Sequence, residues 1–258
     1  MKIVAIIEAR MSSTRLPNKS MKKIVGKPLL ELMIERVKSC KKIDEIVVAT
    51  SIMPENDVIE LLTKKLKVSC FRGSEDDVLG RVLESGKSVN ADIIIELWGD
   101  SPLIDMHILN DLINFFQNNE YDCVGTTFPN FEKTYPLGLS ALIFPLKILE
   151  EVDKITNNSN DRENVSNYIY EHPDKYNIAP LPCPKELNFP NFRLTVDEQS
   201  DFDLINIIFE KLYVSDSQFS AVKVIEFLNS NPKLSEINNT VIQNKLSTWD
   251  QLKNLDPF

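Results

Sequence analysis

The chain has 258 residues, of which 43% are hydrophobic and 26% are charged. This length is at the upper end for one α/β domain, with room for a small insertion, and the composition predicts an ordinary globular core. The net charge of −9 disfavours general nucleic-acid binding, which needs a basic face to offset phosphates.

Short apolar runs alternate with helical stripes over about the first 125 residues. The runs predict strands at residues 2–7, 45–51, 68–71, 92–97 and 121–126. The stripes, with apolar side chains three and four residues apart, predict helices at residues 28–40, 55–66, 76–89 and 106–116. This alternation indicates a mostly parallel sheet with helices on both faces, in which binding residues follow the carboxyl ends of strands.

The alternation weakens after Thr126. Here the pattern predicts strands at residues 139–144 and 192–196, and helices at residues 161–171, from 197–201 to about Tyr213, and at 221–229, before a polar tail. Residues 173–190 contain five prolines, so we expect an excursion rather than core sheet. No internal repeat or low-complexity segment is present.

The sequence shows no targeting or membrane segment. The opening MKIVAIIE is too short for a signal peptide, and no stretch approaches the roughly 20 apolar residues of a membrane span. The four cysteines, which are Cys40, Cys70, Cys123 and Cys183, lie far apart without C-x-x-C spacing. Such thiols are typical of a reducing cytosol, so we expect a cytoplasmic protein without structural zinc.

The loop after the first strand, Glu8 to Lys19, is the first candidate site. Between Ala9 and Pro28 there are six cations and no acid, namely Arg10, Arg15, Lys19, Lys22, Lys23 and Lys27. Ser12 and its neighbours add hydroxyl donors. A donor-rich loop at a strand end favours an anion site, because arginine forks and lysine charges both bind phosphate oxygens. A solvated basic loop is the alternative, and neither a Walker nor a G-x-G-x-x-G motif is present.

Two aspartates follow predicted strands and form the second candidate site. Asp100 comes after strand 92–97 and next to Gly99, and Asp197 ends strand 192–196. Two such carboxylates could hold Mg²⁺, which prefers one or two carboxylates with phosphate oxygens and water. The alternative is a Gly-Asp turn and an acidic helix start, and Asp105 is interpreted as a helix cap.

Other segments carry less chemistry. In residues 72–81, Ser74 or Asp76 could cap a helix, and the backbone there could read a base edge. His107 and His172 fit neither a metal-ligand nor a triad spacing.

Taken together, these segments resemble a known family. EARMSSTRLPNK, GKPLLE, IVVATS, FRGSEDDVLGRV, WGDSPLID, DREN and RLTVDEQSD occur in that order between Ile3 and about Leu246. They are similar to the cytidylyltransferases related to spore-coat polysaccharide biosynthesis protein F, which are relatives of the acylneuraminate and 3-deoxy-manno-octulosonate cytidylyltransferases.

The resemblance implies a Rossmann-like fold of the nucleotide-diphospho-sugar transferase type in a single domain, residues 1–258. It implies transfer of CMP from CTP to a hydroxyl of a sugar acid, with release of pyrophosphate, in surface-glycan biosynthesis. Within the domain, about residues 128–196 would bind the acceptor and form a homodimer, and the excursion at 173–190 is our candidate interface. The acceptor stays open between a nonulosonic acid, an octulosonate and a phosphonate-type acid, and the sequence does not prove CTP over other nucleotides.

The motif match also implies residue roles. Arg10, Arg15 and Lys19 would hold the CTP phosphates, together with the loop residues Ala9, Met11 and Ser12. Ser74, Asp77 and Val78 would line the cytosine and ribose pocket, with Arg81 in support. Asp100 and Asp197 would bind Mg²⁺, and the groups acting in catalysis would be Arg10, Arg15, Lys19 and Asp100.

The sequence departs from the family pattern at several positions. Glu8 stands where the family usually has Gln, so it would point into the sheet or pair with an arginine. Gly80 stands where an acid is common, and the remaining departures are Ser140, Leu142 and Asn164. Two other functions therefore remain open: a nucleotide-sugar glycosyltransferase, for which Asp201-Phe202-Asp203 spells a D-x-D motif, and a non-catalytic nucleotide-binding protein.

Overall fold

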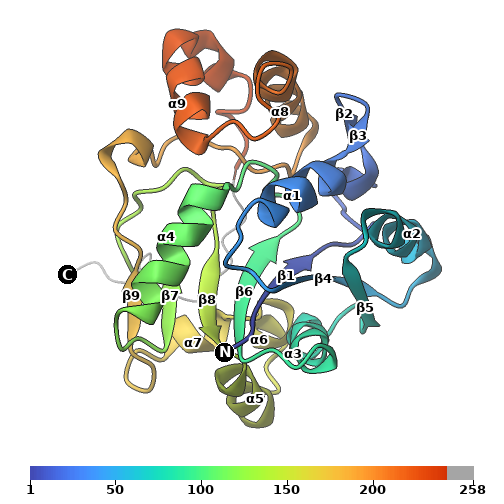
Figure 1. Ribbon diagram of the computed structural model, residues 1–258, viewed down its shortest axis with the longest axis vertical. Helices are drawn as coiled ribbons and strands as arrows, with labels where there is room; N and C mark the ends of the chain where they lie inside the picture. The colour runs from blue at the N-terminus through green and yellow to red at the C-terminus, as the bar shows by residue number, and fades with distance from the viewer. Residues whose placement is uncertain (243–258) are drawn as a thin grey trace.

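A computed structural model describes residues 1–242 of the chain, and in this part seven strands form one sheet (Figure 1). The order across the sheet is β5-β4-β1-β6-β8-β7-β9. The strands are β1 (Ile3–Glu8), β4 (Glu45–Ser51), β5 (Ser69–Gly73), β6 (Ile93–Trp98), β7 (Cys123–Gly125), β8 (Leu142–Pro145) and β9 (Ile178–Pro180). The central strands β1 and β6 are apolar apart from Glu8 and Glu96, as expected for strands with helices on both faces.

Strand direction brings the candidate loops to one edge of the sheet. β1 pairs in parallel with β4 and β6, and β4 pairs in parallel with β5. Among the described strands of this sheet, only β8 runs in the opposite direction, antiparallel to β6 and β7. The carboxyl ends of β1, β5 and β6 therefore lie at the same edge, where ligands bind in open α/β sheets.

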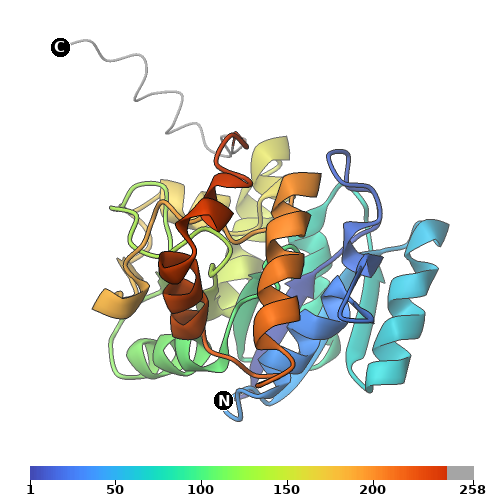
Figure 2. The same ribbon diagram turned by 90° about the horizontal axis from the view of Figure 1, so that it is seen from above.

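Helices cover the two faces and enclose two apolar clusters (Figure 1). One face carries α1 (Leu29–Lys38), α2 (Asp57–Leu66), α4 (Met106–Gln117), α8 (Gln199–Leu212) and α9 (Ala221–Ser230). The other carries α3 (Val78–Ser88), α5 (Leu146–Ile155), α6 (Ser159–Glu163) and α7 (Asn167–Glu171). Figure 2 shows α8 and α9 side by side, at the end of the described chain.

Smaller elements complete the described part. A two-stranded hairpin, β2 (Lys23–Ile24) and β3 (Lys27–Pro28), leads into α1. The short 3₁₀ helices are η1 (Lys19–Met21), η2 (Pro54–Asn56), η3 (Lys185–Leu187) and η4 (Pro232–Glu236).

The structure confirms the predicted fold class, a mostly parallel mixed sheet with helices on both faces. Every strand and helix predicted before residue 121 is present, with shifts of a few residues at the ends. Asp105 caps α4 as expected, since its Oδ1 accepts from the amides of His107 (2.9 Å) and Ile108 (3.0 Å). The chain pattern therefore identified the part of the sheet that supports the candidate loops.

In the second half, three predictions are wrong and one helix was missed. Residues 192–196 form no strand, because Arg193 makes only an isolated bridge to Leu137. The excursion at residues 173–190 contributes the edge strand β9, where Pro180 is tolerated because β9 pairs on one side only. The predicted helix 161–171 is two short helices, and α5 was not predicted.

Two further expectations concern the limits of the described chain. None of the helices in residues 1–242 has the length and hydrophobicity needed to cross a membrane. The predicted single domain and the polar tail extend into residues 243–258, which lie outside the described part, so the domain boundary stays a prediction.

Candidate functional site

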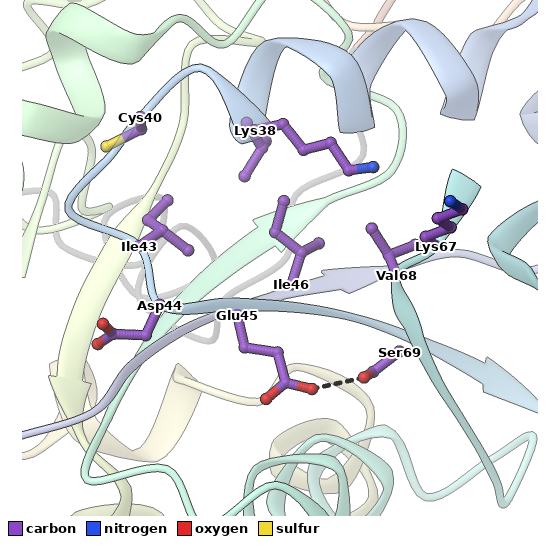
Figure 3. A pocket seen from close by; sticks show the side chains of 10 residues that line it. Lys38, Cys40, Ile43, Asp44, Glu45, Ile46, Lys67, Val68 and Ser69 are labelled. Atoms are coloured by element: carbon purple, nitrogen blue, oxygen red, sulfur yellow. Dashed lines mark hydrogen bonds between the residues drawn. The ribbon is translucent and has the colours of Figure 1, made fainter.

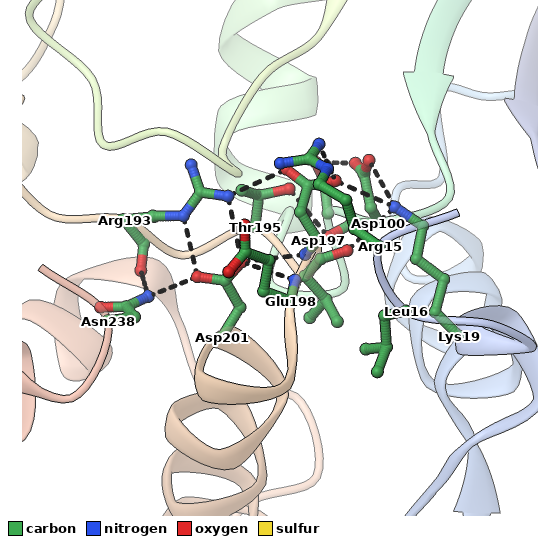
Figure 4. Close-up of polar contacts among 12 residues, drawn as sticks. Arg15, Leu16, Lys19, Asp100, Arg193, Thr195, Asp197, Glu198, Asp201 and Asn238 are labelled. Atoms are coloured by element: carbon green, nitrogen blue, oxygen red, sulfur yellow. Dashed lines mark hydrogen bonds and ion pairs between the residues drawn. The ribbon is translucent and has the colours of Figure 1, made fainter. Parts of the chain in front are cut away.

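Local hydrogen bonds fix the path of the loop that follows β1. The amide of Asn18 donates to the carbonyl of Met11 (3.3 Å), and Asn18 has a left-handed backbone with φ of 59°. The amide of Met11 donates to Oδ1 of the buried Asn56 (2.9 Å). This closed turn starts η1 at Lys19 and directs the Lys19 side chain back toward the carboxyl ends of the strands (Figure 4).

The Lys19 ammonium group lies between the two aspartates predicted to bind metal (Figure 4). Its Nζ donates to Asp100 Oδ2 (3.1 Å), to Asp197 Oδ1 (3.1 Å) and to the carbonyl of Val196 (2.9 Å). Burial lowers the pKa of Lys19, but Asp100 and Asp197 outweigh that effect and the pKa is raised overall. Asp100 and Asp197, which lie about 80 and 180 positions after Lys19 in the sequence, thus bind the same ammonium group.

Arg15 adds a second positive charge to Asp197. Its Nη2 lies 3.1 Å from Asp197 Oδ1, the same oxygen that Lys19 contacts. Arg15, Lys19, Asp100 and Asp197, four of the predicted site residues, are therefore brought together by the fold. Their side chains are 30%, 15%, 26% and 8% exposed respectively, so the arginine and Asp100 are the more open members.

The segment that carries Asp197 is extended but belongs to no sheet. Its backbone bonds run to two loops, with the Leu194 amide donating to the Leu137 carbonyl (2.6 Å) and the Val196 amide to the Asp100 carbonyl (2.8 Å). Gly138 makes this approach possible, because it has φ of +97° and a Cβ there would lie 2.3 Å from the Leu194 carbonyl carbon. The second bond links the backbones that carry the two aspartates.

Arg193, Asp201 and Asn238 hold Asp197 from the other side, and the sequence prediction missed all three. Arg193 Nη2 donates to Asp197 Oδ2 (2.9 Å), and its Nε donates to Asp201 Oδ1 (2.8 Å). Asp201 Oδ2 accepts from the Asp197 amide (3.0 Å), and Asn238 Nδ2 donates to Asp201 Oδ1 (2.8 Å). The quoted motif RLTVDEQSD contains Arg193 and Asp201, but only the fold shows that they contact Asp197.

A second group of predicted residues gathers around Glu75, which was also missed. Glu75 Oε1 accepts from Arg10 Nη1 (3.2 Å) and from the Ser12 hydroxyl. The Arg81 guanidinium donates to the carbonyls of Ser74 and Glu75, the latter at 3.2 Å. Glu75 thus ties the loop after β1 to the loop after β5, and Arg10 lies with this group rather than with Lys19.

The start of α3 explains the departure at Gly80. Asp77 caps the helix, accepting from the Gly80 amide (3.0 Å), and also accepts from Arg162 Nε (2.8 Å). A Cβ at Gly80 would lie 2.3 Å from Asp77 Oδ2. The ion pair therefore occupies the space that a side chain at position 80 would need. Val78 is buried in the core, so only its main chain faces the loop.

Glu8, the unexplained acid of the first loop, forms a carboxyl pair inside the sheet. It hydrogen-bonds Glu96 on the neighbouring strand β6 and lies near Arg81. Burial raises the pKa of Glu8 to about 7, against the lowering effect of Arg81, and burial also raises the pKa of Glu96 well above its usual value. Because burial favours the protonated form of both acids, Glu8 need not carry a charge at the end of β1.

The donor set of the first group suits a magnesium ion better than a transition metal. In residues 1–242, no three or more His, Cys, Asp and Glu side chains are grouped to hold a metal. Mg²⁺ is usually bound by one or two carboxylates, and phosphate oxygens and water molecules supply its other ligands. The Lys19 ammonium already occupies the position between these carboxylates as a cation.

The hollow shown in Figure 3 lies elsewhere. It has a volume of about 270 Å³ and is lined by the end of α1 and the starts of β4 and β5, including Cys40, Glu45 and Ser69. These strand starts lie at the amino-terminal edge of the sheet, opposite the loops described above. The hollow therefore belongs to neither group of candidate residues.

The D-x-D spelling at residues 201–203 forms no paired carboxylate site. Asp201 is fully buried and completes the capping box of α8, whereas Asp203 is exposed. A glycosyltransferase would need both acids at a strand end, so this alternative loses its structural basis.

Comparison with known proteins agrees with the geometry. Residues 4–247 match the model of the cytidylyltransferase family. The chain is 37% identical to an uncharacterized protein of Methanocaldococcus jannaschii, over 94% of this chain and 97% of that one. It is 32% identical to spore coat polysaccharide biosynthesis protein SpsF of Bacillus subtilis, over 89% and 95%.

A solved structure supports the same assignment at the level of fold. A cytidylyltransferase from Leptospira borgpetersenii superposes with a TM-score of 0.85 at 34% identity, covering 95% of this chain and all of that one. The predicted resemblance is thereby confirmed, and the non-catalytic alternative is not supported. The chain belongs to the cytidylyltransferase family and is a CTP-dependent nucleotidyltransferase.

Proposed function

We propose that this enzyme transfers CMP from CTP to a hydroxyl of a sugar acid, releases pyrophosphate, and uses Mg²⁺. One observation carries the proposal: Lys19 and Arg15, from the loop after β1, converge on Asp100 and Asp197 at the carboxyl edge of the sheet. Cations for phosphates and carboxylates for a metal are what in-line attack on an α-phosphorus requires, because no protein nucleophile takes part.

The chain's own residues divide the work of binding the triphosphate. Arg15 and Lys19 stabilise charge on the leaving pyrophosphate, and Arg10, held by Glu75, offers a third donor to the phosphates. The backbone of residues 74–78 and Arg81 lie behind this loop, where they support the nucleoside. Each cation is presently paired with a carboxylate, so binding exchanges one anionic partner for another.

Asp100 and Asp197 are the residues that would hold Mg²⁺. When bound, the ion would neutralise phosphate charge and favour ionisation of the attacking hydroxyl. Arg193 and Asp201 keep Asp197 in place, so that its Oδ1 is directed at Lys19 and Arg15 while Oδ2 stays bonded to Arg193. The proposal thus gives the two aspartates the binding role and Arg193 a positioning role.

A sugar acid is the acceptor class that the motifs support. The resemblance extends to acylneuraminate and 3-deoxy-manno-octulosonate cytidylyltransferases, and the B. subtilis relative is named for polysaccharide biosynthesis. We therefore propose a role in surface-glycan biosynthesis. Residues 128–196 would supply acceptor contacts and a homodimer interface, and the four free cysteines fit a cytoplasmic site of action.

The test is a pyrophosphate-release assay with each of four nucleoside triphosphates, Mg²⁺ and a panel of nonulosonic, octulosonic and phosphonate-type acids. We expect release with CTP and one acid class, together with a CMP-linked product identified by mass spectrometry. Release of UDP from a UDP-sugar, or of CMP from a CMP-sugar, instead would support glycosyl transfer. No release with any pair would overturn the proposal.

A further inference from the structure

We propose that Lys19 and Arg15 are exchangeable counter-ions, which neutralise Asp100 and Asp197 in the free protein and move to the triphosphate only when a divalent cation replaces them. This inference rests on the proposed function, since it takes the two aspartates as the metal site. It adds that metal and triphosphate binding are coupled through two named side chains.

The two oxygens of Asp197 have different partners, and this difference carries the argument. Oδ2 accepts from Arg193 (2.9 Å), which is 9% exposed and is also held by the fully buried Asp201. Oδ1 faces Lys19 and Arg15, both at 3.1 Å, from the loop after β1. The Oδ2 contact is part of the buried framework, whereas the Oδ1 contacts come from more exposed side chains that can rotate away.

The charges of the cluster balance without any ligand. Ion pairs join three carboxylates to three cations, and the six residues are Asp100, Asp197, Asp201, Arg15, Lys19 and Arg193. A divalent cation that displaces Lys19 and Arg15 brings two positive charges, which equal the charges of the two side chains it replaces. The aspartates then keep the same charge balance, and both side chains are released as free cations.

The released side chains need an anion. Lys19 is 15% exposed, and an ammonium group left there without a partner is strongly unfavourable. A metal alone must therefore compete with Lys19 at the carboxylates, and a triphosphate alone must compete with the carboxylates for Lys19. When both ligands are present, each removes the competitor of the other, so that their binding is reciprocally coupled.

The coupling predicts opposite effects of two substitutions. In Lys19→Met, Mn²⁺ should bind the nucleotide-free protein about tenfold more tightly than in the wild type, because the cation that contacts both aspartates is gone. In Asp197→Asn, Arg15 loses its carboxylate and Lys19 keeps only Asp100, so CTP should bind about fivefold or more tightly in EDTA while metal binding is lost. A role of Lys19 in folding alone would move neither constant in these directions.

The experiment uses the full chain and two binding measurements. The free Mn²⁺ signal in electron paramagnetic resonance gives the metal dissociation constant without nucleotide, and calorimetry in EDTA gives that of CTP. Lys23→Met removes an exposed charge from the hairpin that follows the same loop, and Asp203→Asn removes an exposed carboxylate from α8. Neither control should change its constant. If Lys19→Met fails to fold by circular dichroism, Arg15→Met provides the same test at a more exposed side chain.

The outcomes separate this inference from the proposed function. Equal Mn²⁺ affinity in the wild type and both cation variants would overturn the exchange but leave cytidylyl transfer intact. If no variant binds Mn²⁺ while pyrophosphate release proceeds, the aspartates are not the metal site and the inference is wrong. Failure of the pyrophosphate-release assay with a normal exchange result would instead overturn only the proposed function.

Discussion

Asp100 and Asp197 share the Lys19 ammonium group but differ in how firmly they are held. Asp197 is bonded to three cations and is 8% exposed, whereas Asp100 is 26% exposed and its Oδ1 accepts from the neighbouring Ser101 hydroxyl (3.2 Å). Substitution of Asp100 therefore disturbs the framework less, and it gives the cleaner test of the metal role.

Asp100→Asn keeps the shape of the side chain but removes its charge. We expect kcat for pyrophosphate release to fall about 100-fold or more, because one of the two carboxylates proposed to hold Mg²⁺ is lost. Asp203→Asn, with its exposed carboxylate on α8, should retain wild-type kcat. Near-native release from Asp100→Asn would remove Asp100 from the metal site.

The Glu8–Glu96 pair predicts how stability depends on pH. The pKa of Glu8 is about 7 in the folded protein, above its ordinary value of 4.5, so between these values the native state binds more protons than the unfolded state. The free energy of unfolding should then fall as pH rises through this window, by at most about 1.4 kcal/mol per pH unit for each proton.

In Glu8→Gln, the free energy of unfolding should fall less steeply with pH, because the amide does not titrate in this range. Thermal unfolding between pH 5 and pH 8 would measure it, and we expect the variant to be more stable than the wild type at the upper end. Glu84→Gln, on the exposed side of α3, should follow the wild-type curve. Parallel curves for Glu8→Gln and the wild type would contradict the assignment of a buried pair.

The residues of the site were predictable where a local motif carries them. Arg15, Lys19 and Asp100 follow the strands β1 and β6, whose apolar runs mark their ends clearly in the sequence. Asn238 lies in no motif, and Glu75 lies within FRGSEDDVLGRV, where the resemblance gave it no role. They matter because folding places them against Asp201 and Arg10, and long-range contacts of that kind leave no periodic pattern.

At the scale of elements, the close contact between Gly138 and the backbone of residues 194–195 sets the position of Asp197. The backbone of residues 194–195 lies against Gly138 so closely that a Cβ would approach Thr195 N to 2.4 Å, at a φ of +97°. Gly138→Ala should therefore destabilise the protein through both backbone strain and collision, and it should displace Asp197.

Gly26→Ala separates the two effects. Gly26 also has a positive φ, of +81°, but its Cβ would meet nothing within 4 Å. We expect it to cost about 1–2 kcal/mol of stability from backbone strain alone, with unchanged kcat, whereas Gly138→Ala should cost more and lower kcat. Chemical denaturation measures the stability and the pyrophosphate assay measures kcat. Equal losses of stability and kcat in Gly26→Ala and Gly138→Ala would disprove the collision.

Prediction of elements succeeded where burial is continuous and failed where tertiary contacts decide. FRLTV alternates like a strand, yet its amides and carbonyls are bonded to loops at Leu137 and Asp100 instead of a neighbouring strand. Residues 178–180 look unlike a strand because Pro180 interrupts them, but an edge position needs hydrogen bonds on one side only.

For the whole molecule, ligand binding should stabilise the fold through the loops that it connects. CTP with Mg²⁺ at about 100 times its dissociation constant should add about 2.7 kcal/mol to the free energy of unfolding. In a chain of this size this corresponds to a rise in Tm of about 5–10 °C. Differential scanning fluorimetry measures the shift.

Arg15→Glu should remove most of this shift and raise the KM for CTP strongly, because a negative charge would then face the phosphates. Lys23→Glu makes the same change of charge on the exposed hairpin, and its shift should equal that of the wild type. An undiminished shift and an unchanged KM in Arg15→Glu would exclude Arg15 from the phosphate site.

The contact between Asn238 and Asp201 also orders events during protein synthesis. The loop after β1 leaves the ribosome early, but Asp197 receives its full support only when α8, α9 and Asn238 have followed. A nascent chain therefore exposes Arg15 and Lys19 well before Asp197, the carboxylate that both contact, has been synthesised. Until residue 197 has followed, Arg15 stands without this carboxylate, and the emerging chain presents a basic loop to the surrounding polyanions.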